Sequence, residues 1–166
     1  VVTVSDGTAP LLTLKGSTSL VHEAKTDFNG DGATAIDTVG GEIAVTSSGT
    51  VDINTLGTYV INYNTTDAAG NTATATRTVT VVDTTSPTIS MGSGTVTHEA
   101  ATAYSDEVPT ATDTLDGVVS VTTSGTVDVS TVGSYILTYS VSDEAGNIAT
   151  ATRTVTVVDT TSPTIS

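Results

Sequence analysis

The chain has 166 residues, no cysteine, and a formal charge of −14 from 18 Asp and Glu against 4 Lys and Arg. The absence of cysteine excludes disulfides and thiolate metal or redox sites, and the strong acidity argues against nucleic-acid and anionic-membrane partners. No apolar run reaches membrane-spanning length, so no membrane insertion is expected, and no signal peptide is present.

The sequence repeats itself with a period of 76 residues. The string GNTATATRTVTVVDTTSPTIS ends at Ser90, and the near-copy GNIATATRTVTVVDTTSPTIS ends at Ser166 (166 − 90). A fixed period indicates that one folding unit has been duplicated. We therefore expect the end of a preceding repeat in residues 1–5, a first repeat over 6–82, a second over 83–158, and the start of a third in 159–166. The chain reads as an excerpt from a tandem array.

Each repeat is a series of short segments rich in Thr and Val, separated by turn residues, and β-branched residues of this kind favour strands. In chain order, the first repeat predicts strands over residues 11–14, 20–23, 33–37, 42–47, 50–53, 58–66 and 72–82. The first two are the halves of a split strand, and 50–53 is a minor strand. Many short strands without a helical period favour an all-β fold of two tandem, Ig-like, seven-strand β-sandwiches arranged end to end.

The predicted strand order brings acidic residues together at one end of each sandwich. When the termini lie at opposite ends, the loop after the second strand, the last hairpin and the incoming segment share an end. Asp37 closes the second strand, Asp67 opens the last hairpin, and Asp6 lies in the incoming segment. The equivalent residues of the second repeat are Asp113, Asp143 and Asp83.

Crowded carboxylates suit Ca²⁺, which takes six to eight oxygen ligands. Asn71 and Asn147 are candidates to complete the two shells, and Asp116, whose counterpart is Gly40, would enrich the second one. The alternative interpretation is that Asp at strand ends simply caps turns with its side chain.

A second candidate metal site lies in the first repeat alone. Asp27, Asn29 and Asp31 fit the D-x-N-x-D-G opening of an EF-hand-type loop, but Thr38 stands where the loop usually ends in an acid. The second repeat does not share this pattern. The alternative is a polar connection between strands.

No constellation of residues predicts catalysis, and we expect a protein that is not an enzyme. His22-Glu23 and His98-Glu99 recur, but no second His follows four residues later, so the zinc motif H-E-x-x-H is absent. We expect structural histidines, with the glutamates free to lend an oxygen to a neighbouring calcium. The threonines of 72–82 line one face of their strand, a ridge that Arg77 is expected to interrupt, as on an ordinary solvent-facing strand.

The pattern Y-x-[IL]-x-Y-x-x-x-D-x-A-G-N…T-V-T-V-V-D-T-T-x-P resembles hyalin repeats and related bacterial Ig-like repeats of large surface proteins, and it covers both repeats. A looser resemblance is to cadherin repeats, through residues 34–37, Asp67 and the segment 81–87. That resemblance implies calcium at the joints, with Asp83, Asp113 and Asp143 as ligands. The chain departs from the cadherin linker at 84–86, where Thr-Thr-Ser replaces further Asn and Asp ligands.

Together these observations predict structural extender repeats of an extracellular bacterial adhesin, at the cell surface or secreted. The repeats would form a rod stiffened by Ca²⁺ at their joints, with adjacent repeats of the same chain as partners. The alternatives are a module that itself binds a glycan or protein, and accessory domains of a secreted enzyme. The sequence identifies no external ligand.

Overall fold

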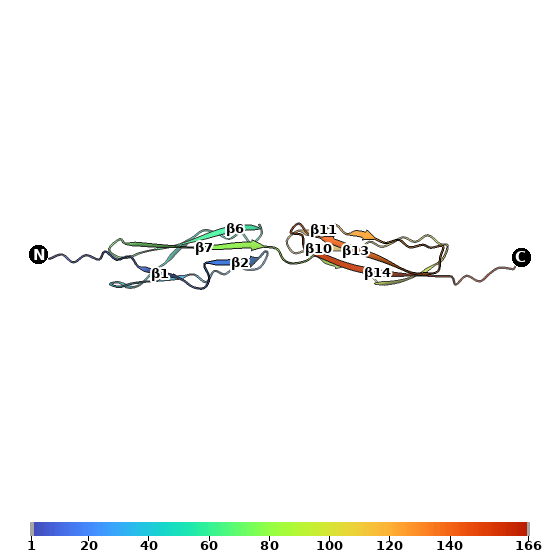
Figure 1. Cartoon of the computed structure of the whole chain (residues 1–166), viewed down its shortest axis with the longest axis horizontal. Coiled ribbons are helices and arrows are strands. Elements are labelled where there is room, and N and C mark those ends of the chain that lie inside the picture. The colour runs from blue at the N-terminus through green and yellow to red at the C-terminus, as the bar shows by residue number, and fades with distance from the viewer. Residues whose placement is uncertain (1, 166) are drawn as a thin grey trace. The chain divides into compact units, whose positions relative to one another are not determined.

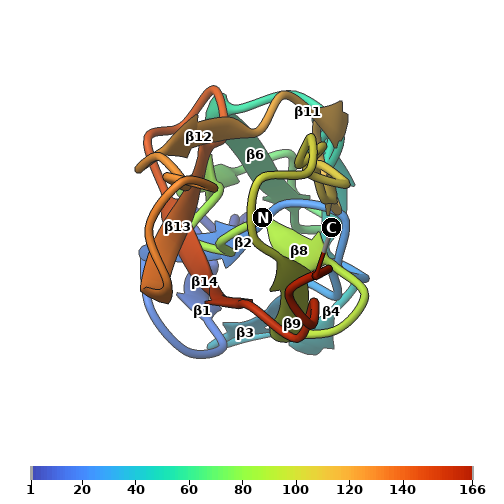
Figure 2. The ribbon, with the colours of Figure 1, turned by 90° about the vertical axis from the view of Figure 1, so that its right-hand side faces the viewer.

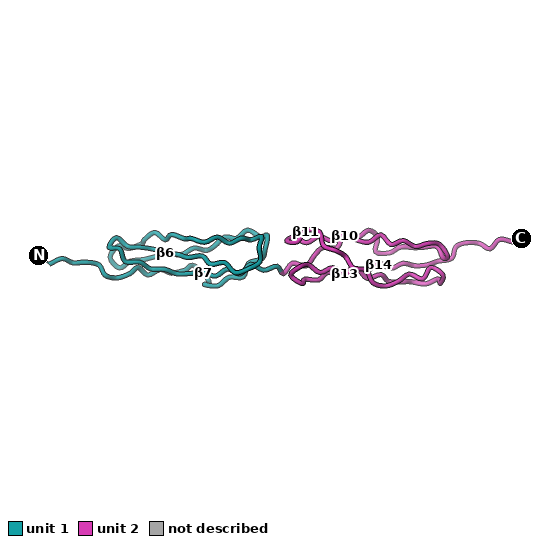
Figure 3. Tube along the Cα trace, turned by 90° about the horizontal axis from the view of Figure 1, so that it is seen from above, with its two compact units in different colours: residues 1–83 teal, residues 84–166 magenta. Residues whose placement is uncertain are grey.

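The computed structural model describes residues 2–165, and every regular element among them is a β-strand (Figure 1). The chain divides into two compact units, Val1–Asp83 and Thr84–Ser166, which Figure 3 shows in different colours. Each unit is an Ig-like sandwich of two sheets, as the sequence predicts. The units are described separately below.

Unit 1 has seven strands in two sheets. The three-stranded sheet, in the order β1-β3-β4, contains β1 (Leu11–Leu14), β3 (Ala33–Asp37) and β4 (Gly41–Ile43). The four-stranded sheet, in the order β2-β7-β6-β5, contains β2 (Ser19–Glu23), β5 (Thr46–Ser48), β6 (Gly57–Thr66) and β7 (Thr72–Val82). All pairs are antiparallel except β2 with β7, which run parallel with Leu20 opposite Val79. The predicted split first strand is therefore real, because its halves β1 and β2 belong to different sheets.

Unit 2 repeats this topology. Its three-stranded sheet, in the order β8-β10-β11, contains β8 (Thr88–Ser90), β10 (Thr110–Asp113) and β11 (Gly117–Val119). Its four-stranded sheet, in the order β9-β14-β13-β12, contains β9 (Thr95–Glu99), β12 (Thr122–Ser124), β13 (Gly133–Ser142) and β14 (Ile148–Val158). Figure 2 shows this unit from its far end, with β13 and β14 on one side and β8 and β11 on the other.

Two strand predictions need correction. The strand expected over 42–47 is broken into β4 and β5, which lie in different sheets. The minor strand expected over 50–53 is absent from the described structure, because the Asp52 side chain folds this segment into a turn. Its carboxylate accepts hydrogen bonds from Asn54 N at 2.9 Å and from Thr55 Oγ1 at 2.8 Å, and such local bonds compete with a strand ladder.

The core of each unit lies between its two sheets and follows the period of two that strands impose. In unit 1 it centres on Ile61, Tyr63 and Val79, and in unit 2 on Leu137, Tyr139 and Val155. The threonines of β7 alternate with these buried residues and form the outer face.

The arginines that recur in the two repeats also face inward, so the expectation that Arg77 interrupts the threonine ridge is wrong. Arg77 and Arg153 stand at odd positions among even-numbered threonines, so they share the core face, and both are buried. Arg77 Nε donates to Ser17 O at 2.9 Å, and its Nη2 donates to Lys15 O. Main-chain carbonyls thus satisfy the donors of a guanidinium that could not be buried otherwise.

Candidate metal centre

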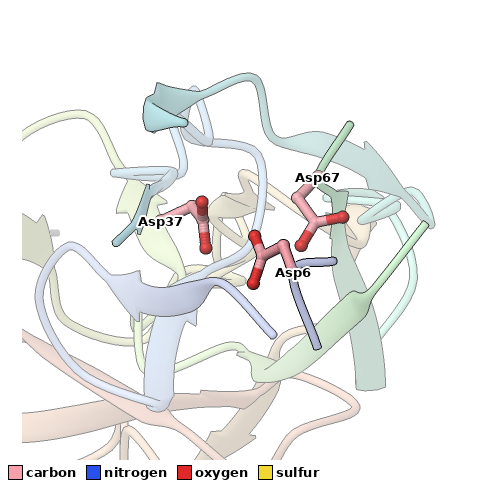
Figure 4. A group of neighbouring side chains, drawn as sticks. All are labelled: Asp6, Asp37 and Asp67. Atoms are coloured by element: carbon pink, nitrogen blue, oxygen red, sulfur yellow. The ribbon is translucent and has the colours of Figure 1, made fainter. Parts of the chain in front are cut away.

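Three carboxylates converge at the leading end of unit 1. Asp6 comes from the segment before β1, Asp37 is the last residue of β3, and Asp67 follows β6. One carboxylate oxygen from each lies within 4.8 Å of the other two. Figure 4 shows these side chains approaching from three separate segments, with Asp6 between Asp37 and Asp67 in that view. The convergence expected from strand order is therefore present, and metal binding by these residues stays a prediction.

Asp37 is the best-buried member of the cluster, with 4% of its surface exposed. Its Oδ2 accepts hydrogen bonds from Val39 N at 2.8 Å and Gly40 N at 2.6 Å, because the chain turns sharply after β3. Its Oδ1 is buried and has no hydrogen-bond partner. A buried carboxylate oxygen without a hydrogen-bond partner is costly, and in proteins such an atom is commonly satisfied by an ordered water or an ion.

Asp67 is held by the tight hairpin between β6 and β7. Its Oδ1 accepts from Ala69 N at 2.9 Å and Asn71 N at 2.8 Å, and its Oδ2 accepts from Asn71 Nδ2 at 2.7 Å. The hydrogen bonds from Asn71 lower the pKa of the Asp67 carboxyl, so this group is ionised. The Asn71 amide nitrogen also donates to Asp6 O at 3.3 Å. Asn71 therefore orients two acids of the cluster, and its own role as an oxygen ligand stays a prediction.

Asp6 is fixed by a local turn with Thr8. Its Oδ1 accepts from Thr8 N at 3.0 Å and from Thr8 Oγ1 at 2.7 Å. Both bonds to Thr8 use Oδ1, which leaves Oδ2 able to bind a cation. The turn determines where the carboxylate of the incoming segment points, although that segment lies outside both sheets.

The cluster has no basic counter-charge. Among residues 2–165 the salt bridge between Arg153 and Asp106 lies in unit 2, and none is formed by Asp6, Asp37 or Asp67. Two carboxylates about 4 Å apart repel by about 1 kcal/mol in water and about 4 kcal/mol near a protein surface. A divalent cation would remove this repulsion and satisfy Asp37 Oδ1. Carboxylate and main-chain oxygens without sulfur or imidazole fit Ca²⁺ better than zinc or copper.

Unit 2 carries the equivalent pair. Asp113 ends β10 and Asp143 follows β13, and their nearest carboxylate oxygens lie within 4.8 Å of each other. Asp113 Oδ1 accepts from Leu115 N at 2.7 Å, while its buried Oδ2 has no hydrogen-bond partner. Asn147 Nδ2 donates to Asp143 Oδ2 at 2.8 Å, as Asn71 does in unit 1. Asp83 is the last residue of unit 1, and its membership of the second set stays a prediction.

Asp116, the extra acid proposed for the second set, already has a partner. Its Oδ2 accepts a hydrogen bond from Glu144 N at 2.8 Å, and it lines a cavity of about 280 Å³ that Asp143 and Glu144 also line. It thus ties the turn after β10 to the last hairpin of unit 2. Metal ligation by Asp116 remains a prediction.

The EF-hand-like loop does not gather its acids in the same way. Asp27, Asn29 and Asp31 are all exposed. Among the residues that the structure describes, neither acid belongs to a group of three His, Asp or Glu ligands within 4.8 Å. Metal binding by this loop stays a prediction without support from its geometry.

The histidines make contacts typical of structural residues. His22 Nε2 lies 3.1 Å from Thr26 O, and the His22 ring meets the edge of Phe28 with ring centroids 5.1 Å apart. His98 repeats this arrangement with Thr102 and Tyr104.

Sequence reasoning missed the role of Glu99. Its two carboxylate oxygens accept hydrogen bonds from Thr160 and Thr161, in the segment that leaves unit 2. The recurrence of His-Glu in both repeats was the available signal, but it did not reveal the partner.

The seven-strand sandwich and its acid-bearing leading end define an Ig-like repeat module. Comparison with known families specifies it further: the chain matches the family described as "Bacterial surface protein, Ig-like domain" over residues 12–81 and 89–157. These matches cover most of the chain and fall in units 1 and 2. The chain therefore belongs to the bacterial surface Ig-like domain family.

Two curated relatives resemble the sequence. Hyalin of Lytechinus variegatus is 38% identical over 144 residues, which are 80% of this chain and 27% of the relative. Hyalin of Strongylocentrotus purpuratus is 35% identical over 180 aligned positions, covering 99% of this chain and 15% of the relative. The chain thus spans less than a third of the length of the relatives it matches.

A solved structure supports the fold. The M60 catalytic domain with the CBM51-1 and CBM51-2 domains from Clostridium perfringens ZmpB matches with a TM-score of 0.52 at 13% identity. The match covers 90% of this chain and 31% of that one. At this identity the likeness concerns the fold alone.

Family membership indicates an extracellular or surface-exposed module. Among residues 2–165 there is no helix with the length and apolar character needed to cross a membrane.

Proposed function

We propose that this chain is a segment of structural extender repeats from a bacterial surface or secreted adhesin, in which Ca²⁺ at the leading end of each repeat stiffens the joint with the repeat before it. Membership of a surface Ig-like family and the tandem duplication support the extender role. The calcium is supported by the acid cluster and above all by one atom, the buried and unpartnered Oδ1 of Asp37.

The origin of the three acids explains how one ion would stiffen a joint. Asp37 and Asp67 belong to the body of the sandwich, whereas Asp6 belongs to the segment before β1, which would arrive from the preceding repeat in the proposed array. An ion bound by all three would fasten that segment to the sandwich. Without the ion, mutual repulsion of the carboxylates favours release of Asp6, the only member of the three that is not fully buried.

The direct test is thermal unfolding in Ca²⁺ and in chelator. Calcium at a hundred times its dissociation constant should stabilise a unit by about 2.7 kcal/mol, because it binds only the folded state. Asp37→Asn keeps an oxygen for the Val39 and Gly40 amides but removes one charge. We expect this variant to lose the calcium-dependent gain of unit 1 while being at least as stable as the wild type in chelator.

Asp52→Asn is the matched control, because Asp52 is an exposed acid with its own turn contacts outside the cluster. It should retain the full response to calcium. Equal melting temperatures of the wild type in calcium and chelator would refute the metal site. Small-angle scattering tests stiffening separately: if chelator lowers the melting temperature of the wild type but leaves its scattering unchanged, the stiffening role is wrong.

A further inference from the structure

Glu99 binds the segment that leaves unit 2 at three points. Its Oε1 accepts from Thr160 N at 2.9 Å and from Thr161 Oγ1 at 2.9 Å, and its Oε2 accepts from Thr160 Oγ1 at 2.7 Å. We call Glu99, Thr160 and Thr161 the exit clasp. All three bonds form between protein groups, so the exit clasp needs no metal.

Strand pairing places Glu99 where the chain leaves the sandwich. β9 runs parallel to β14 with Glu99 opposite Val158, so the two strands end at the same level. Ala100 N donates to Val158 O at 2.7 Å and closes the ladder. The residues after Val158 therefore emerge directly beside the Glu99 carboxylate.

Thr161 of the exit clasp also bonds to Asp159. Thr161 N donates to Asp159 Oδ1 at 3.1 Å, which forms the same local turn that Thr8 N forms with Asp6 Oδ1 at 3.0 Å. Asp6 is the member of the unit 1 cluster that the incoming segment supplies. Asp159, in the segment leaving unit 2, thus makes the same local hydrogen bond as the cluster member Asp6.

We propose that the exit clasp presents Asp159 to the leading end of a further repeat of this family, whose buried aspartate pair, equivalent to Asp37 and Asp67, completes a calcium site with it. This inference rests on the proposed function and adds the partner of the site and a positioning residue for it. Glu99 acts through Thr160 and Thr161, to which both of its carboxylate oxygens are bonded, and its proposed role is positioning and not ligation.

The repeat extends the proposal to the joint inside the chain. Glu23 precedes Asp83 by the same 60 positions by which Glu99 precedes Asp159 (83 − 23 and 159 − 99), and Asp-Thr-Thr-Ser-Pro follows in both places. The same sequence in the same topology predicts the same role for Glu23.

The first experiment measures the exit clasp without metal. In chelator, amide hydrogen exchange of Thr160 should be about tenfold faster in Glu99→Gln than in the wild type, because Gln cannot accept all three bonds. Nitrogen-15 relaxation should show residues 159–161 ordered in the wild type and mobile in the variant. Glu42→Gln, which alters an exposed acid of unit 1, is the control and should change neither measurement.

The second experiment separates positioning from ligation. Calorimetric titration with Ca²⁺ should show Glu23→Gln binding the same number of ions as the wild type with affinity about three- to tenfold lower, equivalent to losing about one hydrogen bond. Fewer bound ions would make Glu23 a ligand and overturn the proposal. Mobile 159–161 amides in the wild type in chelator would also overturn it, yet would leave the calcium response of the Asp37 variant, and so the proposed function, intact.

Discussion

At the scale of single residues, the two units differ most in the surroundings of the buried arginine. In unit 2 Arg153 Nη1 contacts Asp106 Oδ1 at 2.6 Å, and the Tyr139 hydroxyl donates to Asp106 Oδ2 at 2.8 Å. The position equivalent to Asp106 is Gly30 in unit 1. Burial and the neighbouring Asp106 carboxylate raise the pKa of Tyr139 to about 12.

This shift predicts alkaline sensitivity. Tyr139 stays protonated in the folded state up to its raised pKa, whereas an unfolded tyrosine ionises near its ordinary value of about 10. The unfolded state therefore binds fewer protons between these values, and stability falls as the pH rises through them. The loss should be roughly 2 kcal/mol by pH 12, measured by urea unfolding at a series of pH values.

Tyr139→Phe is the matched variant, because it removes the titrating hydroxyl and keeps the ring. Its stability should fall less than that of the wild type between pH 10 and 12. If the unfolding free energies of the two proteins fell in parallel as the pH rose, Tyr139 would not titrate as stated.

At the scale of elements, one glycine determines how closely the loop after β12 approaches β13. Gly125 has φ of 96°, and a Cβ there would lie 2.3 Å from Ile136 O. In unit 1, a Cβ on Gly49 would lie at the same distance from Val60 O. The loop therefore packs directly on the strand backbone, which leaves no room for a side chain.

Gly125→Ala should destabilise unit 2 by about 3 kcal/mol or more, since the substitution adds a backbone clash to a strained φ. Gly146→Ala is the control: its φ of 93° carries similar strain, but no atom lies within 4 Å of its Cβ. It should cost about 1 kcal/mol. Chemical denaturation measures both, and equal losses would show that the close approach to Ile136 is not rigid.

The strands that the sequence predicted well have turn residues at both ends. The range 72–82 and the range 33–37 match β7 and β3, because alternation and turn residues at both ends define them. The range 42–47 did not reveal its break into two sheets, since both halves read as strand and only pairing separates them. The segment 50–53 has β-branched residues, but the Asp52 turn overrides their propensity.

The acid cluster was predictable for a topological reason, as Asp37 and Asp67 stand at strand ends that any such sandwich brings together. The exit clasp was not predictable. Glu99 lies 61 positions from Thr160, and their contact depends on the parallel pairing of β9 and β14, which side-chain alternation does not encode.

At the scale of the whole molecule, the charge of −14 makes electrostatic repulsion a general cost of folding. In chelator, raising monovalent salt from about 0.01 M to about 0.1 M shortens the screening length from about 30 Å to about 10 Å. We expect the melting temperature to rise with salt over this range. In saturating calcium the rise should be smaller, because bound ions already neutralise the closest carboxylates.

The double variant Asp37→Asn, Asp113→Asn serves as the control for this experiment. It removes one charge from each cluster, so its salt dependence in chelator should be weaker than that of the wild type. The contrary result is a melting temperature that rises with salt by the same amount for the wild type in chelator, the wild type in calcium and the double variant in chelator. That result would mean that the repulsion is spread over the surface and does not originate in the clusters.

The parallel pairing of β2 with β7, and of β9 with β14, has a mechanical consequence. In each pair, the chain enters the earlier strand (β2 or β9) from the N-terminal side of the unit. The later strand (β7 or β14) leads out towards the C-terminus. Tension on the two ends of a unit therefore pulls the paired strands in opposite directions along their length. Their five registered residue pairs are loaded in shear and must break together, whereas a hairpin pulled from its open end would unzip one bond at a time. A module built this way resists stretching as a whole.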